Sequence, residues 1–308
     1  MIDPTETAVM LIVFNRPEHT RQVFERIREA RPKRLYVSAD GPRPDRPDDL
    51  ESIEATRKVA LDVDWPCEVK TLLRKQNLGC KTAIKTGLDW FFSQEEDGII
   101  LEDDCVPDPT FFRYAAEMLD KYRNDDRIAT IAGTNYLLGS QQFEDSYYFT
   151  KYLFVWGWAS WRRVWQDYDF EIKRWPKFRD EGRLHQVFPH PRSLKYWTWI
   201  FDRTHDETLN AYDYQFFFSQ LINHRMSIVP ARNLISNIGW GSGSTNTAHK
   251  NPEMGMETFP MEFPLRHPEF MVPDERADTY TEHLMFAKPL HRKVRNRLRR
   301  IVARWGEQ

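Results

Sequence analysis

Short apolar runs and longer segments with helical periodicity alternate along the first third of the chain. Apolar runs bounded by turn residues predict four strands, at residues 8–14, 34–39, 68–73 and 98–101. Segments with apolar residues at helical spacing predict helices between them, at residues 18–30, 45–60 and 81–93. Strands that alternate with helices indicate an α/β fold, with a central, mostly parallel sheet flanked by helices.

The pattern changes in the second half of the chain. A helix at residues 110–123 and a strand at residues 128–132 continue the alternation, but residues 147–218 are crowded with Trp, Tyr and Phe. Five prolines in residues 252–273 predict an irregular, wrapping segment. The aromatic side chains exceed what a core of that length normally needs, so we expect some of them to face a ligand.

Composition narrows the class of protein. The chain has 308 residues, with 41% hydrophobic and 29% charged residues, which excludes a disordered or collagen-like chain. No run approaches the roughly 18 apolar residues that a membrane-spanning helix needs. Residues 8–14 lack the flanks of a signal peptide, and the three cysteines form no CxxC pattern. We therefore expect a cytoplasmic protein.

Positive charge is concentrated near the C-terminus. Residues 288–305 hold eight Lys and Arg and no acid, so the remaining 290 residues carry −2 − 8 = −10. Apolar residues recur there at helical spacing, which predicts a basic amphipathic helix over residues 284–308. Such a helix suits an anionic membrane at the inner face, or packing on the body of the protein. The acidic remainder argues against nucleic-acid binding.

Polar residues follow three of the predicted strands. They are Asn15 with Arg16, Asp40 with Gly41, and the acidic triplet of residues 102–104. Parallel sheets bind ligands at the carboxyl ends of their strands. Three adjacent carboxylates repel one another unless a cation or hydrogen-bond donors compensate, and a divalent ion with a bound diphosphate would do so. The alternative is a solvated acidic turn, but the position directly after an apolar strand favours the binding site.

These residues carry a family resemblance. Residues 101–112 read LEDDCVPDPTFF, an acidic triplet followed by an apolar residue, a proline and a Phe pair. The motifs FNRP, SADG, NLG, GW and YDY surround it, at residues 14–17, 38–41, 77–79, 157–158 and 212–214. In this order the chain resembles, over roughly residues 8–250, GT-A-fold nucleotide-sugar glycosyltransferases. The likeness is greatest to the N-acetylglucosaminyltransferase I type and its bacterial relatives.

The resemblance implies a set of donor-binding residues. Asn15, Arg16 and Asp40 would hold the nucleotide, with Asp40 accepting from a uracil N–H. Lys85 would meet the diphosphate, or Lys81 one turn earlier on the same helix face. The plainer alternatives are exposed salt bridges for the cations and a tight turn for Asp40.

The resemblance also implies a metal site that takes Mn²⁺ or Mg²⁺. Asp104 would ligate the ion, Asp103 would contact the ribose or the sugar, and Glu102 would orient these two carboxylates or the sugar. Bacterial relatives often place a His in the glycine-rich loop after the last strand, where this chain has Asn246, with His249 three residues later. His249 is a candidate second ligand, and the alternative is an ion held by Asp104, diphosphate and water alone.

Asp213 matches the catalytic base of the family. Its aromatic neighbours would desolvate it and raise its pKa, and the reaction would then be a single in-line displacement with inversion. Its plainer role is that of a helix N-cap, because an apolar helical run follows. Tyr212 and Trp158 would contact the acceptor. Nearby acids remain alternative bases: Asp202, Asp206 and Glu207.

The sequence as a whole predicts a metal-dependent inverting glycosyltransferase. It would move a sugar from a UDP-sugar to a saccharide, lipid-linked or protein-linked acceptor. Residues 1–115 would bind the nucleotide sugar and residues 116–283 the acceptor, within one GT-A domain. The alternatives are a non-catalytic carbohydrate-binding or nucleotide-sugar-binding protein and a metal-dependent phosphohydrolase, although the latter would want a second cluster of carboxylates.

Overall fold

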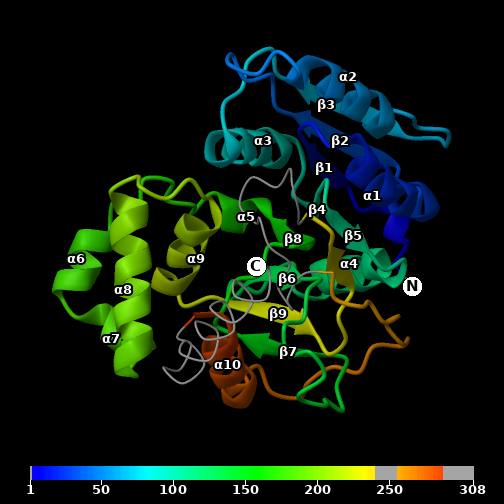
Figure 1. Ribbon diagram of the computed structural model, residues 1–308. Coiled ribbons are helices and arrows are strands. Elements are labelled where there is room, and N and C mark those ends of the chain that lie inside the picture. Colours follow the sequence, from blue (N-terminus) through cyan, green and yellow to red (C-terminus); the bar gives the residue numbers. More distant parts are fainter. Residues whose placement is uncertain (1, 240–254, 287–308) are drawn as a thin grey trace, which may run out of the picture.

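The protein is built around one large sheet flanked by helices (Figure 1). A computed structural model describes residues 2–239 and 255–286. The strand order in the sheet is β3-β2-β1-β4-β8-β6-β9-β7. Six of these eight strands run in one direction and two, β8 and β7, run against them, because β4, β6 and β9 pair with them antiparallel. The predicted α/β class, with a mostly parallel central sheet between helices, is confirmed.

The strands follow the predicted apolar runs in the first half of the chain and add new ones in the second. The sheet contains β1 (Val9–Val13), β2 (Arg34–Ala39), β3 (Glu68–Leu73), β4 (Asp97–Glu102), β6 (Ile128–Ala132), β7 (Tyr147–Thr150), β8 (Trp158–Trp161) and β9 (Met226–Pro230). A separate antiparallel pair is formed by β5 (Cys105–Pro107) and β10 (Ile235–Asn237).

Helices connect the strands. In the second half of the chain, several helices also pack together on one side of the molecule (Figure 1). They are α1 (Pro17–Ala30), α2 (Asp49–Ala60), α3 (Cys80–Gln94), α4 (Thr110–Lys121), α5 (Arg162–Trp165), α6 (Trp175–Asp180), α7 (Arg183–Val187), α8 (Pro191–His205), α9 (Asp213–Ile222) and α10 (Glu275–Thr281). A short 3₁₀ turn, Pro4–Glu6, precedes β1, and a π-helical turn, Glu282–Phe286, follows α10.

Local sequence explains where the first helix begins and ends. Pro17 occupies the first turn of α1, where its missing N–H costs nothing. The helix stops at Arg31, which adopts a left-handed conformation with φ of 51° and donates its N–H to the carbonyl of Ile27. Between these ends, Val23, Phe24 and Ile27 lie on one buried face. The apolar positions that predicted this helix form the face that packs on the sheet.

The register of the parallel strands brings the predicted site together. Val13 lies opposite Ala39 of β2, and Ile12 lies opposite Glu102 of β4. The three strands therefore end side by side, and the residues that follow them share one edge of the sheet. The β5–β10 pair adds a second constraint, since Cys105 lies opposite Asn237 and draws the segment after β10 against Asp104.

Two hydrophobic clusters support these elements. The larger, the sheet core, is built on the strands of the sheet with α1, α3 and α4. The smaller lies under α6, α7, α8 and α9, and we call it the aromatic core. Ten of its nineteen buried residues are aromatic, against sixteen of 47 in the sheet core. Trp197 is its centre, with ring centroids 4.7 Å from Phe217 and 5.4 Å from Phe188.

The predicted segments differ from the observed ones mainly outside the first half. The helix expected at residues 45–60 begins at Asp49, because that carboxylate is held by Arg43 in the preceding loop. Residues 255–273 contain no helix or strand, as their prolines indicated. Most of the predicted basic helix over residues 284–308 lies outside the described residues. No helix of the described part of the chain has the length and apolarity needed to span a membrane.

Candidate functional site

The acidic triplet lies at the carboxyl end of β4, as its position in the sequence predicts. Glu102 ends the strand, and the backbone turns through Asp103 and Asp104 into β5. Asp103 is buried, with 7% of its surface exposed, and its Oδ2 accepts a hydrogen bond of 3.2 Å from the backbone N–H of Phe14. Burial, and then the charge of Asp104, raises the pKa of Asp103 to about 7 despite the opposing effect of Arg16.

Glu102 is held in a similar environment. Burial raises the pKa of its carboxyl to about 8, and the charges of Asp104, Asp103 and Asp213 add to the effect. The hydroxyl of Tyr212 lies 3.4 Å from Oε1 and donates to it. Two carboxyls with raised pKa values, side by side, indicate a place where negative charge is incompletely compensated.

Arg16 is the cation that faces this triplet from the end of β1. Its Nη1 lies 2.9 Å from Oδ2 of Asp104 and 3.7 Å from Oδ1 of Asp103. Burial acts to lower the pKa of the guanidinium, but the charges of Asp103 and Asp104 outweigh it and raise the pKa above its usual value. We call Glu102, Asp103, Asp104 and Arg16 the acidic edge. Three carboxylates and one guanidinium leave two negative charges uncompensated when all are ionised.

The segment after β10 closes over Asp104. The backbone N–H of Ile238 donates to the carbonyl of Asp104 at 2.8 Å, and Nδ2 of Asn237 lies 3.4 Å from Oδ1. A Cβ atom at Gly239 would lie 1.9 Å from Oδ2 of Asp104. Only glycine fits this position without moving the carboxylate of Asp104.

The acidic edge suits a hard divalent cation that also contacts a ligand. Among the described residues, no group of three or more His, Cys, Asp or Glu side chains converges in a way that would hold a metal ion by itself. Asp104 offers carboxylate oxygens, the ligand type that Mg²⁺ and Mn²⁺ favour, and the uncompensated charge around it favours a cation. The remaining ligands would come from a bound diphosphate and water. His249 lies outside the described residues.

Asp40 is engaged with the neighbouring loop. Its carboxylate accepts hydrogen bonds from the backbone N–H groups of Gly41, Leu78 and Gly79, at 2.9, 3.0 and 3.2 Å, and from Nδ2 of Asn77 at 3.0 Å. Gly79 has a φ of 76°, a conformation that favours glycine, and it precedes the first residue of α3. Asp40 therefore anchors the loop that starts α3, a contact that neither the nucleotide-binding role nor the tight turn considered for it in the sequence predicted.

Asn15 takes part in a second anchor beside the acidic edge. Its Nδ2 donates to Oδ1 of Asp49 at 3.0 Å. Arg43 binds the same carboxylate through Nε and Nη2, at 2.6 and 2.7 Å, and its guanidinium lies 5.4 Å from the ring centre of Phe14. The hydrogen bonds from Arg43 lower the pKa of Asp49 to about 2. Arg43 follows the same strand end as Asp40 but was not among the predicted site residues.

The two lysines of α3 have partners away from the acidic edge. Nζ of Lys81 lies 3.6 Å from Oε1 of Glu207 and 4.6 Å from the ring centre of Phe170. Lys85 is paired with Asp89 at 2.5 Å and lines a separate cavity of about 540 Å³. Donor binding through either lysine would require it to leave these contacts.

Cys80, the first residue of α3, lies near enough to the acidic edge for the charges there to affect the pKa of its thiol. Burial raises the pKa of its thiol to about 12, and the charges of Glu102, Asp213, Asp104 and Asp40 contribute. The sequence offered no signal for this cysteine, because its place depends on how α3 packs.

Asp213 is the first residue of α9, and Tyr212 occupies the N-cap position. The carboxylate accepts the backbone N–H groups of Asp213 and Tyr214, which act to lower its pKa, but burial is the larger effect and raises it. Asp213 borders a cavity of about 160 Å³ whose walls include Trp156 and Phe217. A carboxylate with a raised pKa beside a small aromatic cavity suits proton abstraction.

The aromatic residues around Asp213 have different roles from those predicted. Trp158 is fully buried in β8 with its ring centroid 5.4 Å from that of Phe216, so neither face of the indole is open to an acceptor. Trp156, two residues earlier, is half-buried and borders the cavity instead. Tyr212 is buried, with its hydroxyl on Glu102 and its carbonyl accepting from the hydroxyl of Tyr168 at 3.0 Å.

Comparison with known proteins gives distant structural likenesses. No family model matches the chain, and no curated protein does. Solved structures similar to it include an apo UDP-glucose pyrophosphorylase, with a TM-score of 0.37 and 10% identity over 72% of this chain and 90% of that one. HddC from Yersinia pseudotuberculosis has a TM-score of 0.32 and 10% identity over 56% and 86% of the two chains. The CMP:2-keto-3-deoxy-manno-octonic acid synthetase complexed with CTP has a TM-score of 0.33 and 13% identity over 59% and 86%. Likenesses of this size assign no activity, and the functional argument rests on the site.

Proposed function

We propose that this protein is a metal-dependent, inverting glycosyltransferase. It would transfer a sugar from a nucleotide-diphosphate donor, a UDP-sugar, to a saccharide, lipid-linked or protein-linked acceptor. One observation carries the proposal: a partly buried acidic edge with surplus negative charge ends β4, and Asp213 is near enough for its charge to raise the pKa of Glu102. A cation site and a separate, desolvated carboxylate are the two parts that glycosyl transfer requires.

Residues 1–115 would bind the donor. Asp104 would hold Mn²⁺ or Mg²⁺, and the ion, when bound, would supply neutralisation of the leaving diphosphate. Asp103 would contact the ribose or the sugar, a role supported by its burial and by the backbone N–H that fixes its carboxylate. Arg16 would turn from Asp104 towards the donor phosphates, since both partners are negatively charged. Arg43 would add a second cation on the nucleotide side.

Residues 116–283 would bind the acceptor and supply the base. Asp213 would accept the proton of the acceptor hydroxyl as that oxygen attacks the anomeric carbon, and its raised pKa suits this role. Attack from the side opposite the diphosphate would invert the anomeric carbon. Trp156, at the border of the adjacent cavity, is the ring best placed to contact the acceptor.

Donor binding tests the proposal directly. Isothermal titration of UDP-sugars, with Mn²⁺ and then with EDTA, should give saturable binding only with the metal. Asp104→Asn should abolish this binding, whereas Asp120→Asn, an exposed acid of α4, should leave it unchanged. Binding that survives EDTA or Asp104→Asn would contradict the cation site.

Turnover separates the proposal from its alternatives. Transfer of the sugar to an added saccharide, with release of UDP, is the expected result. Release of inorganic phosphate without any acceptor would favour a phosphohydrolase. Donor or saccharide binding without turnover across a broad acceptor panel would favour a binding protein.

A further inference from the structure

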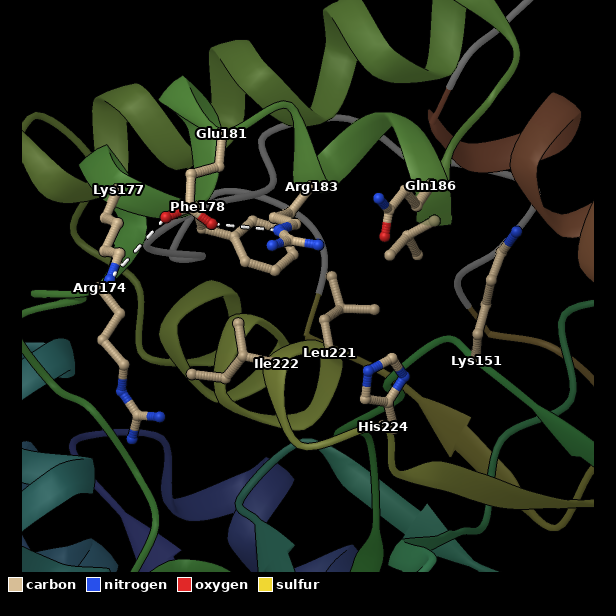
Figure 2. A pocket seen from close by; sticks show the side chains of 11 residues that line it. Lys151, Arg174, Lys177, Phe178, Glu181, Arg183, Gln186, Leu221, Ile222 and His224 are labelled. Atoms are coloured by element: carbon tan, nitrogen blue, oxygen red, sulfur yellow. Dashed lines mark hydrogen bonds and ion pairs between the residues drawn. The ribbon is translucent and has the colours of Figure 1, made fainter.

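A basic cavity lies on the far side of the aromatic core from the acidic edge. Its volume is about 600 Å³, within the range of small-molecule sites. It is open to solvent and is bordered by α6, α7, the last turn of α9 and the turn after β7, and Figure 2 shows its side chains. Nothing in the proposed glycosyl transfer uses it.

Cations predominate around this cavity. Lys151, Arg174, Lys177 and Arg183 line it, and Glu181 is the one acid among its described lining residues. The formal charge of the lining is therefore 4 − 1 = +3, in a chain whose net charge is −2. Such an excess of like charge on one concave surface disfavours the empty site and favours an anion.

The partners of these four cations show how much positive charge is available to a ligand. Glu181 is shared, with Oε1 3.8 Å from Nζ of Lys177 and Oε2 3.1 Å from Nε of Arg183, as the dashed lines in Figure 2 indicate. No ion pair of the Lys151 or Arg174 side chain occurs within residues 2–239 and 255–286. Nζ of Lys151 instead lies 4.9 Å from the ring centre of Phe188. Lys151 and Arg174 thus have no carboxylate within ion-pair distance, although the charge of Lys151 acts to lower the pKa of the buried Asp278. Lys177 and Arg183 share one acid.

The interior of the cavity is apolar. Phe178, Leu221 and Ile222 lie between the charged side chains in Figure 2. The ring of Phe178 is held by an edge contact with Phe218, with centroids 5.5 Å apart. An apolar wall under a cationic rim suits a ligand that combines a ring-sized body with an anionic group, because aromatic and aliphatic side chains pack on the C–H faces of sugars.

We propose that this basic cavity binds a phosphate monoester carried on a sugar ring. A phosphate monoester has a charge of about −1.5 to −2 at pH 7, which matches an excess of three positive charges better than a single carboxylate does. Arg and Lys are the usual partners of phosphate oxygens. A flat anionic membrane would not reach the apolar interior of a concave site, so a discrete ligand is favoured over a lipid surface.

The site is separate from the proposed catalytic carboxylate. Asp213 is the first residue of α9, and Leu221 and Ile222 are its last two. At 1.5 Å per residue, the cavity lies about 13 Å along the helix axis from Asp213. The proposal does not depend on the glycosyltransferase assignment. Titrations in EDTA keep the two apart, since the proposed donor site requires a divalent ion.

Calorimetric titration of the full-length protein with glucose 6-phosphate tests the proposal. Glucose and inorganic phosphate are the matched probes for the ring and the charge alone. We expect saturable, one-to-one binding of glucose 6-phosphate, at least about fivefold weaker binding of inorganic phosphate, and none of glucose. Equal affinity for inorganic phosphate would overturn the sugar component, and absence of saturable glucose 6-phosphate binding would overturn the site.

Three substitutions and a control locate the binding. Lys151→Gln and Arg174→Gln should each weaken glucose 6-phosphate binding about tenfold, because each removes a charge-assisted hydrogen bond. Glu181→Gln should strengthen it severalfold by releasing Lys177 and Arg183. Lys173→Gln, whose lysine is exposed and paired with Glu171, should change nothing.

Two outcomes of the variant series would refute the location. One is unchanged affinity in both Lys151→Gln and Arg174→Gln. The other is binding to phosphatidylglycerol vesicles that glucose 6-phosphate does not displace, which would assign the basic surface to a membrane.

Discussion

The acidic edge and the aromatic core differ in what they bury. The residue before α9, Tyr212, contacts the acidic edge, and Phe217, Phe218 and Leu221 of α9 belong to the aromatic core. The acidic edge buries carboxylates whose pKa values are raised, with one guanidinium to balance three acids. The aromatic core buries rings, with Trp197 and Phe217 at van der Waals distance. Burial of apolar rings stabilises the fold, whereas burial of under-compensated charge opposes it. The acidic edge, whose buried charge lowers the stability of the fold, is therefore a candidate for function. The aromatic core, whose burial only raises that stability, is a candidate for a structural role.

Asp213 joins the two regions, and its removal should have the largest effect on activity. Asp213→Asn keeps an oxygen that accepts the backbone N–H groups but cannot take a proton at neutral pH. We expect kcat for sugar transfer to fall about 10²- to 10⁴-fold, with UDP-sugar affinity nearly unchanged. Asp202→Asn, which removes one of the alternative bases, in α8, is the control for the assignment of the base. A large loss in the control with little in Asp213→Asn would assign the base to another residue.

Replacement of Trp197 tests the contribution of the aromatic core to stability, as replacement of Asp213 tests activity. Trp197→Ala should lower the free energy of unfolding by about 3–5 kcal/mol, because it leaves a cavity among packed rings. Trp199→Ala, two residues along α8 and 50% exposed, should cost much less. Denaturant unfolding followed by circular dichroism measures both. Equal losses in the two variants would show that the core does not depend on the buried ring.

Asp278 of α10 is a buried carboxyl beside the aromatic core, next to Ala277 of that cluster. It is buried, and burial raises its pKa to about 6, although Thr150 donates a hydrogen bond to it. A carboxyl with a raised folded-state pKa binds more protons when folded, so the free energy of unfolding should fall as pH rises from about 4 to 6. Two pKa units correspond to roughly 3 kcal/mol at most.

Asp278→Asn should remove that part of the pH dependence. The measurement is the free energy of unfolding of wild type and variant, from pH 4 to 7. Asp62→Asn, at an exposed position, should keep the wild-type slope. A variant slope that matches the wild type over this window would falsify the titration of Asp278.

Replacement of Asp103 tests whether the acidic edge buries charge for function, and it has the smallest expected effect on stability. Asp103→Asn removes a buried charge beside Asp104 but retains an acceptor for the N–H of Phe14. We expect the ligand-free protein at pH 8 to be more stable by on the order of 1 kcal/mol, and UDP-sugar binding with Mn²⁺ to weaken. Thermal unfolding and titration measure the two effects. A variant that is less stable and binds as well as wild type would remove the argument that charge is buried here for function.

The sequence predicted the first half of the fold closely. The strands at residues 34–39, 68–73 and 128–132 have the predicted limits, because each is a short run rich in apolar and β-branched residues between turn residues. The strands at residues 147–150 and 158–161 were missed. Their aromatic residues are common to buried strands and buried helices, and only pairing with β9 and β4 makes them strands.

For the candidate site, the sequence predicted which residues gather at the strand ends more closely than it predicted the contacts that they make. Arg16, Asp103 and Asp104 meet as the strand-end rule predicts. Asp40, Lys81 and Lys85 make local contacts that depend on how α3 and its loop pack. Pairing between distant segments decides such contacts, and no local pattern encodes it.

The sequence by itself determined the α/β alternation and the acids and cation at the strand ends, since both follow from local periodicity and chain direction. Tertiary structure alone decided which tryptophan borders the cavity beside Asp213, that Gly239 closes on Asp104, and that four cations from separate segments surround one cavity. The reason is physical: periodicity sets which face of an element is buried, but the neighbours on that face come from the packing of segments far apart in the chain.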